Sequence, residues 1–181
     1  MIYDLGSNYF VRAFEESDLA GPYTSWFQDQ DVCKYNSHGS FQKNNNWFRS
    51  FYEGLKKEDQ VVWAICHKED GHIGNVALQN LSFINRNAAF SILLGNKKHW
   101  GKSVGLLVGQ ALLQHGFDKL NLNKMYCGTA ATNKGMIKLA NALGMSEEGR
   151  RRQHLFLEGQ WVDVLEFGVL KDEFENTMNN K

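Results

Sequence analysis

The sequence predicts an α+β fold built on one mixed β-sheet. Apolar runs rich in β-branched residues alternate along the chain with segments whose apolar residues recur at helical spacing. Turns with glycine join several of the β-type runs, and two helical segments of the second half lie between strands. The length of 181 residues suits one domain with a sizeable core, so we expect a single domain over residues 1–181.

The first half of the chain supplies most of the expected strands. "YFVRAF" (9–14) is typical of a strand, and Ser17 is suited to cap a helix over 18–27, because its hydroxyl can accept a bond from a free amide of the first turn. A second helix is expected over 44–57, where four large apolar residues share one face. Three further strands are expected at 61–67, 73–83 and 87–95.

The period of the apolar residues changes after the last of these strands. Val104, Leu107, Val108, Ala111 and Leu112 follow the spacing of an amphipathic helix that reaches Phe117. The run 124–130 predicts a strand, and 133–144 predicts a helix with Gly144 as its C-cap. The segment 152–170 predicts two strands joined at a Glu-Gly turn.

Composition excludes several classes of function. Basic and acidic residues balance at 20 each, so nothing draws the protein to nucleic acid or to an anionic membrane. No apolar run is long enough to cross a bilayer, and the first residues lack the pattern of a signal peptide. The three cysteines, Cys33, Cys66 and Cys127, are far apart, which disfavours disulfides and a zinc site. We therefore expect a cytoplasmic protein with no metal.

The stretch "HWGKSVG" (His99–Gly105) joins an expected strand to an expected helix. Free N–H groups and the helix dipole make such a place an anion site, and Lys102 adds a positive charge. Neither the G-x-x-x-x-G-K-[ST] nor the G-x-G-x-x-G phosphate motif is present. A tight turn that needs glycine and binds nothing explains the loop equally well at this point.

The whole chain resembles the GNAT superfamily of acyl-CoA-dependent N-acetyltransferases. The similar segments are "VRAFEESDLAGPYTSWFQDQDV", "HIGNVAL", "ILLGNKKHWGKSVG", "LNLNKMYCGTAATNKGMIKLANALGM" and "EEGRRRQHLFLEGQWVDVLEFGVL". The chain looks most like the RimJ/RimL branch, and it is also similar to amino-sugar acetyltransferases. The resemblance implies a mostly antiparallel sheet with helices on both faces, and acetyl-CoA as the cosubstrate.

In that family the loop binds the pyrophosphate of coenzyme A, and the preceding strand splays from its neighbour and pairs with the pantetheine arm. The residues that the resemblance places against the cosubstrate are Ile92, Leu93, Leu94, Trp100, Gly101, Lys102, Ser103, Val104, Gly105 and Asn133. Asn133 is equally suited to be the N-cap of the next helix, and one amide can serve both purposes. Many relatives have glycine in place of Ser103, so the serine suggests an ordinary backbone angle there.

The usual catalytic groups of that family are missing. Ala89 stands where many relatives have a glutamate, and Met136 and Ala140 stand where many have a serine or a tyrosine that protonates the leaving thiolate. His154 is a candidate general base, because an imidazole titrates near neutral pH. A solvated surface histidine beside Arg150–Arg152 is the alternative, and loss of the amine proton through water is the favoured route.

These observations predict an acetyl-CoA-dependent N-acetyltransferase that acts on a primary amine. An amino-sugar nucleotide and a protein N-terminus are the two leading acceptors. A non-catalytic protein that binds or senses acyl-CoA is the alternative, because the usual acid and base are absent. We expect neither nucleic acid nor a membrane as a partner, and a homodimer is left open. The three arginines at 150–152 can bind a substrate phosphate or form a solvated strand edge.

Overall fold

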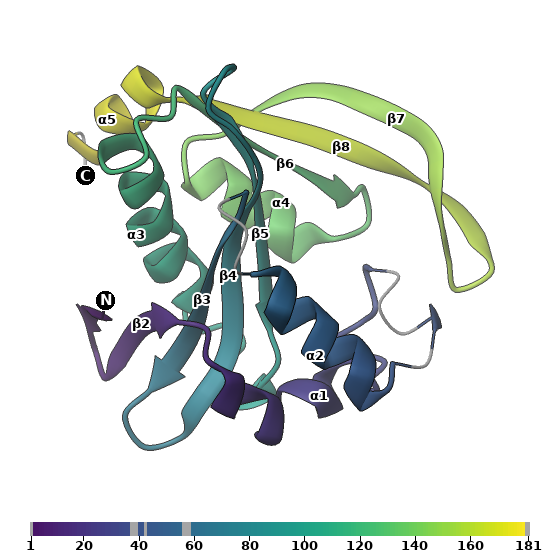
Figure 1. Cartoon of the computed structure of the whole chain (residues 1–181). Helices are drawn as coiled ribbons and strands as arrows, with labels where there is room; N and C mark the ends of the chain where they lie inside the picture. The colour runs from purple at the N-terminus through teal and green to yellow at the C-terminus, as the bar shows by residue number, and fades with distance from the viewer. Residues whose placement is uncertain (1, 37–39, 42, 56–58, 180–181) are drawn as a thin grey trace.

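The computed structural model describes residues 2–36, 40–41, 43–55 and 59–179. The elements in chain order are β1 (Ile2–Gly6), β2 (Tyr9–Ala13), η1 (Glu16–Ala20), α1 (Tyr23–Trp26), α2 (Asn45–Gly54), β3 (Val61–His67), β4 (Gly71–Ser82), β5 (Asn87–Leu94), η3 (Lys97–His99), α3 (Val104–Asp118), β6 (Lys124–Ala130), α4 (Lys134–Ala142), β7 (Ser146–Leu157), β8 (Gln160–Leu170) and α5 (Lys171–Asn179) (Figure 1).

All the strands named above belong to one 8-stranded sheet, in the order β1-β2-β3-β4-β5-β6-β8-β7. Of its neighbouring pairs only β5 and β6 run parallel, and the others are antiparallel. The parallel pair needs a crossover, which α3 supplies. The predicted α+β class with a mixed, mostly antiparallel sheet is confirmed.

The helices cover both faces of this sheet. Trp63 and Ile65 of β3 point into an apolar cluster shared with α3, α4 and α5. Ala64 and Cys66 alternate with them and point into a second cluster, shared with α1 and α2. Figure 1 shows α3 and α2 on different sides of the strands. No helix in the described ranges has both the length and the apolar character that a bilayer crossing requires.

The predicted helix over 18–27 is wrong in its extent. Two short helices, η1 and α1, replace it, and Pro22 is the N-cap of the second. Glu15, not Ser17, caps η1, in a reciprocal capping box with Asp18. Asp18 accepts a bond from the Glu15 amide and two from the Arg12 guanidinium, so tertiary contacts fix the chain there and end the first helix early.

Two elements escape the sequence patterns. β1 is a half-exposed edge strand, and glycine and asparagine around its turn hide the alternation that marks a strand. α5 is rich in charged residues, and Phe174 is its buried anchor, in contact with Phe117 of α3. Neither segment has the run of apolar residues from which an element can be predicted.

A buried ionic cluster lies under the α1–α2 side of the sheet. Asp18 is 5% exposed, and its Oδ1 lies 2.6 Å from Arg12 Nη2 and 3.4 Å from His72 Nδ1. Burial opposes the charge on Asp18, but the bonds from Arg12 and from the Glu15 amide outweigh it and hold its pKa below the usual value. Burial lowers the pKa of His72 in spite of the Asp18 charge, so His72 is neutral in the folded protein.

We expect the free energy of unfolding to fall as the pH drops below the ordinary histidine value of about 6.5. The unfolded chain takes up a proton at His72 that the folded chain resists, so the folded state loses stability as the pH falls toward the lowered pKa. Urea unfolding at pH 7.5 and 5.5 measures this loss. It should be smaller in His72→Phe, which keeps a ring between Tyr23 and Trp26. Exposed His154, changed to Gln, is the control, and equal losses in all three proteins would contradict the role of His72.

Candidate active site

The sheet opens between β5 and β6. Their pairing stops at Ala89 and Tyr126, whereas β5 continues to Leu94 and β6 to Ala130. Beyond that point β5 is paired with β4 alone, and β6 with β8. The two strands point in different directions below their paired ends (Figure 1). One edge of β5 therefore keeps free backbone groups that an extended ligand can bind.

Three polar side chains surround the end of this pairing. Gln79 of β4 and Tyr126 of β6 are the register partners of Ala89 on either side. Ser91 lies two residues further along β5, and its hydroxyl donates to Gln79 Oε1 at 3.3 Å. Ala88 and Phe90 point into the α3 side of the core, so Ala89, Gln79 and Tyr126 lie on the opposite face, that of α1 and α2.

The loop after β5 presents a row of free amides. None of the backbone N–H groups from Gly101 to Leu106 has an acceptor within the described part of the chain, and the first bond of α3 runs from the Leu107 amide to Ser103 O. Lys102 is exposed and makes no ion pair with any described residue. Free amides at a helix start, next to an unpaired cation, are suited to a phosphate group.

Ser103 takes a left-handed conformation, with φ 59 and ψ 13, and Gly101 has φ +73. The expectation that serine marks an ordinary angle is therefore wrong. A left-handed turn at this point brings successive N–H groups toward one side, and that geometry outweighs the cost of placing a non-glycine residue there, about 1–2 kcal/mol. The position therefore makes a conformational demand that glycine would meet without strain.

Two contacts hold the loop against β5. The Trp100 indole donates to Leu94 O at 2.8 Å, which ties the loop back to the end of the strand. Gly95 packs so closely on buried Trp26 that a Cβ there would overlap the indole ring. The loop is thus tied to the end of β5 by Trp100, and the residue after β5 is packed against α1 through Trp26.

The structure brings most of the predicted cosubstrate residues to this opening. Ile92, Leu93 and Leu94 are half-buried on the free part of β5, and Ile92 reaches the start of α3 at Gly105. Asn133 follows β6, on the other side of the opening, and caps α4 by accepting from the Met136 amide at 3.1 Å. The capping role is confirmed, and a contact of Asn133 with the cosubstrate stays a prediction.

His154 lies on a separate cluster of the β7–β8 hairpin. It is exposed, and Arg151 Nη1 donates to its Nε2 at 2.8 Å. Arg151 also pairs with Glu166, and both side chains lie across Gly128, where a Cβ would be 3.1 Å from each. Gly128 is two residues beyond Tyr126, so the cluster lies on the same face of β6. The guanidinium uses the Nε2 lone pair with which His154 would have to accept a proton.

The two positions at which the resemblance places a serine or a tyrosine hold apolar side chains, and these side chains have apolar surroundings. Ala140 is fully buried against the α3 side of the core, and Met136 packs against the same cluster. Neither position supplies a proton. Sequence reasoning missed Gln79, Ser91 and Tyr126 as functional residues. Strand alternation alone would have placed Tyr126 and Ala89 outside the α3 cluster, but only the register makes them neighbours.

A comparison with models of protein families identifies the family of the chain. Residues 9–146 match the family model described as Acetyltransferase (GNAT) domain. The chain belongs to the GNAT acetyltransferases. The match begins at β2 and ends at the start of β7, so it contains the opening and the loop with free amides. GNAT acetyltransferases transfer the acetyl group of acetyl-CoA. The phosphate groups of that molecule are ligands of the kind to which the loop with free amides is suited.

Individual relatives agree with the family. Spermidine N(1)-acetyltransferase of Vibrio cholerae is 28% identical over 150 residues, which cover 74% of this chain and 86% of the relative. A putative ribosomal N-acetyltransferase of Bacillus subtilis is 29% identical over 107 residues, covering 59% of this chain and 58% of that protein. The crystal structure of the Vibrio cholerae spermidine N-acetyltransferase with CoA and spermine shares the fold, with a TM-score of 0.84 at 23% identity over 94% of this chain and 100% of that one.

Proposed function

We propose that this GNAT protein transfers the acetyl group of acetyl-CoA to the primary amine of a polar small molecule, best matched by an amino-sugar nucleotide. The observation that carries the proposal is the opening between β5 and β6, which leads to the free amides of Gly101 to Leu106. The loop would hold the pyrophosphate and the edge of β5 the pantetheine arm. The thioester would then lie near Ala89, where the pairing of the two strands ends.

The chemistry at that point is amine attack on a thioester. The neutral amine adds to the carbonyl carbon, the C–N bond forms, and the oxyanion that develops is stabilised by free N–H groups of β5. The C–S bond then breaks, and coenzyme A leaves as a thiolate that takes up a proton. Tyr126 is the register partner of Ala89 on β6, and its hydroxyl is suited to donate that proton. The ammonium proton leaves through water, since Ala89 offers no base.

The polar groups around the opening favour an acceptor with hydroxyl and phosphate groups. Gln79 and Ser91 are neutral hydrogen-bonding groups of the kind that reads sugar hydroxyls. Arg152 is exposed, follows Arg151 along β7 and makes no ion pair within the described residues. An arginine without a carboxylate partner is suited to a phosphate.

A polyamine is the second candidate, because the Vibrio cholerae relative acetylates spermidine, as its name states. A polycation needs carboxylates that are free to pair with it. Asp29 and Asp31 both contact Lys97, Asp163 pairs with Arg150, and Glu166 pairs with Arg151. Hydrogen bonds with Asp31 and Asp29 raise the pKa of Lys97, which keeps that pair charged on both sides. Asp163 and Glu166 are therefore already neutralised, whereas Lys97 leaves one net negative charge on Asp29 and Asp31 together.

An acceptor panel tests the proposal. Release of free thiol from acetyl-CoA is measured with a nucleotide-linked amino sugar, the same amino sugar without the nucleotide, spermidine and a short peptide with a free N-terminus. The proposal expects the highest kcat/KM for the nucleotide-linked sugar. A preference for spermidine would overturn the choice of acceptor. Tight coenzyme A binding with no thiol release for any amine would instead support an acyl-CoA sensor.

We expect His154→Gln to leave the rate constant of the saturated enzyme within about twofold, because its Nε2 already accepts from Arg151. In the parent, this rate constant should climb with pH toward the pKa of the acceptor amine, since water removes the proton. Steady-state pH profiles of both proteins with one acceptor provide the measurement. An inflection in the pH profile that disappears in the variant, with a loss of about 100-fold, would instead make His154 the base.

Three further expectations go with this proposal. The finer placement in the RimJ/RimL branch rests on the sequence resemblance. A homodimer is compatible with the family, and a dodecameric structure is known for the Vibrio cholerae spermidine N-acetyltransferase. Cys33, Cys66 and Cys127 are buried thiols that are not joined in disulfides, which fits the reducing cytoplasm that we propose as the location.

A further inference from the structure

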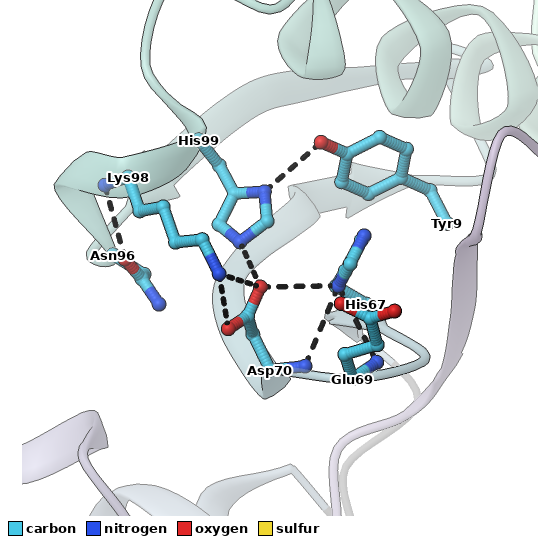
Figure 2. Close-up of polar contacts among 7 residues, drawn as sticks. All are labelled: Tyr9, His67, Glu69, Asp70, Asn96, Lys98 and His99. Atoms are coloured by element: carbon cyan, nitrogen blue, oxygen red, sulfur yellow. Dashed lines mark hydrogen bonds and ion pairs between the residues drawn. The ribbon is translucent and has the colours of Figure 1, made fainter.

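Two histidines and an aspartate converge just before the cosubstrate loop. His67 ends β3, Asp70 lies in the turn that joins β3 to β4, and His99 ends η3. Figure 2 shows both imidazole rings directed at one carboxylate. His99 Nε2 and His67 Nδ1 each lie 3.1 Å from the same oxygen, Asp70 Oδ2. One ligand atom from each of the three residues lies within 4.8 Å of the others.

The bonds around this cluster orient the rings. Tyr9 Oη lies 2.9 Å from His99 Nδ1, and His99 is only 1% exposed, so the opposite nitrogen is fixed toward Asp70 (Figure 2). In the structure Nε2–H donates to Asp70 and the Tyr9 hydroxyl donates to Nδ1. An ion at Nε2 would take the place of that proton, and Nδ1–H would then donate to Tyr9. This pairing of one imidazole nitrogen with an outer hydroxyl is the support that metal-bound histidines usually have.

His67 shows that a cation suits the centre of the cluster. The backbone amides of Glu69 and Asp70 donate to its Nδ1 at 3.4 Å each, so an ion bound to this nitrogen would displace two long hydrogen bonds. The same nitrogen lies 3.1 Å from Asp70 Oδ2, a contact that either a proton on Nδ1 or an ion between the two atoms would stabilise. Lys98 neutralises the carboxylate from its other side, with Nζ 2.8 Å from Oδ1 and 3.0 Å from Oδ2.

We propose that His67, Asp70 and His99 form a binding site for a divalent transition-metal ion, with zinc the ion that the donors fit best. Two neutral imidazoles and one carboxylate oxygen make a zinc donor set, with a water as the fourth ligand. Zinc–ligand distances of about 2.0–2.1 Å put tetrahedral ligand atoms about 3.3 Å apart. The two 3.1 Å contacts at Oδ2 come close to that spacing, so only the two nitrogens have to adjust. Lys98 can keep its bond to Oδ1 while Oδ2 binds the ion.

The position of the site gives the ion a structural task. His99 immediately precedes Trp100, whose indole holds the loop to Leu94. An ion bound to His99 and to the β3–β4 turn would join that turn to the start of the loop with the free amides. The inference is independent of the acceptor and of catalysis, because it concerns how the loop is held.

Titration of the metal-free, untagged full-length chain with Zn²⁺ and with Co²⁺ tests the site. We expect one ion per chain, and a visible Co²⁺ spectrum with the intensity of a four-coordinate nitrogen and oxygen site. Asp70→Asn and His67→Gln change residues that are partly exposed, so the fold should tolerate them. Each should weaken Zn²⁺ binding at least about 100-fold, and Tyr9→Phe should weaken it about tenfold.

Lys98→Met should change the Zn²⁺ affinity in the opposite direction, and His154→Gln is the matched control. Lys98→Met removes the cation that competes for Asp70, so Zn²⁺ should bind about tenfold more tightly. His154→Gln removes an exposed histidine elsewhere and should leave the affinity unchanged. Binding as tight in Asp70→Asn as in the parent would overturn the site. A pale six-coordinate Co²⁺ spectrum, or thiolate bands from a cysteine, would overturn it as well.

Discussion

Replacing Gly95 with alanine is expected to destabilise the protein by about 3 kcal/mol, the upper end of what overpacking usually costs. A methyl group at Gly95 would overlap the ring of Trp26, which is 5% exposed and packed against Tyr23 and His72. The indole cannot retreat, because aromatic rings surround it. Either the start of the loop or α1 has to move. Urea unfolding of the parent and of Gly95→Ala measures the change.

Gly149→Ala is the matched control. A Cβ there meets nothing within 4 Å, and the residue has no positive φ, so its stability should stay within about 0.5 kcal/mol of the parent. The same loss in both variants would show that the replacement of glycine itself, not contact with Trp26, decides the result. If Gly95→Ala unfolds at the same urea concentration as the parent, then Trp26 is not held in this position.

Ser103→Pro is expected to weaken coenzyme A binding at least about 100-fold, which corresponds to roughly 3 kcal/mol. Proline fixes φ near −65°, whereas Ser103 has φ 59, and proline also removes one of the free amides. The turn that brings the N–H groups together would therefore be lost. Calorimetry with coenzyme A measures the affinity, and circular dichroism confirms that the variant is folded.

Ser103→Gly should behave in the opposite way. Glycine takes the left-handed conformation freely and keeps the N–H, so the affinity should stay within about tenfold and the stability should be equal or higher by up to about 1 kcal/mol. Lys102→Ala provides a second variant that leaves the backbone intact, and it should lose affinity without loss of stability. If Ser103→Pro folds and binds coenzyme A as tightly as the parent, the pyrophosphate does not lie on this loop.

The features that follow from local patterns could be predicted from the sequence. Strands β2 to β8 and helices α2, α3 and α4 have clear periodicity, and the structure contains them all. The end of the first helix could not be predicted, because Arg12 reaches Asp18 from a neighbouring strand. The angle at Ser103 could not be predicted either, since residue type gives only a preference and the loop geometry decides.

The candidate site likewise has a part that could be predicted from local sequence and a part that could not. The loop Trp100–Gly105 is one continuous stretch, and its position at a helix start follows from the period change at Val104. Gln79, Ser91 and Tyr126 come from three strands, and only the register brings them around Ala89. The same is true of His67, Asp70 and His99, which are separated along the chain and meet in the folded turn. Contacts of this kind depend on the tertiary arrangement, which periodicity does not contain.

The short parallel pairing of β5 and β6 has a consequence for how the chain folds. β1 to β5 form a meander whose neighbours are consecutive in sequence, and β6, β8 and β7 form a second group beside it. Within each group the neighbouring strands share longer ladders, such as Tyr9–Ala13 with Trp63–His67 and Lys124–Ala130 with Val164–Leu170. The seam between them has only the pairs from Asn87 to Ala89, and it closes a long loop that contains α3. It should form last and open first in native-state hydrogen exchange, and a cosubstrate bound across it would slow that exchange on both sides.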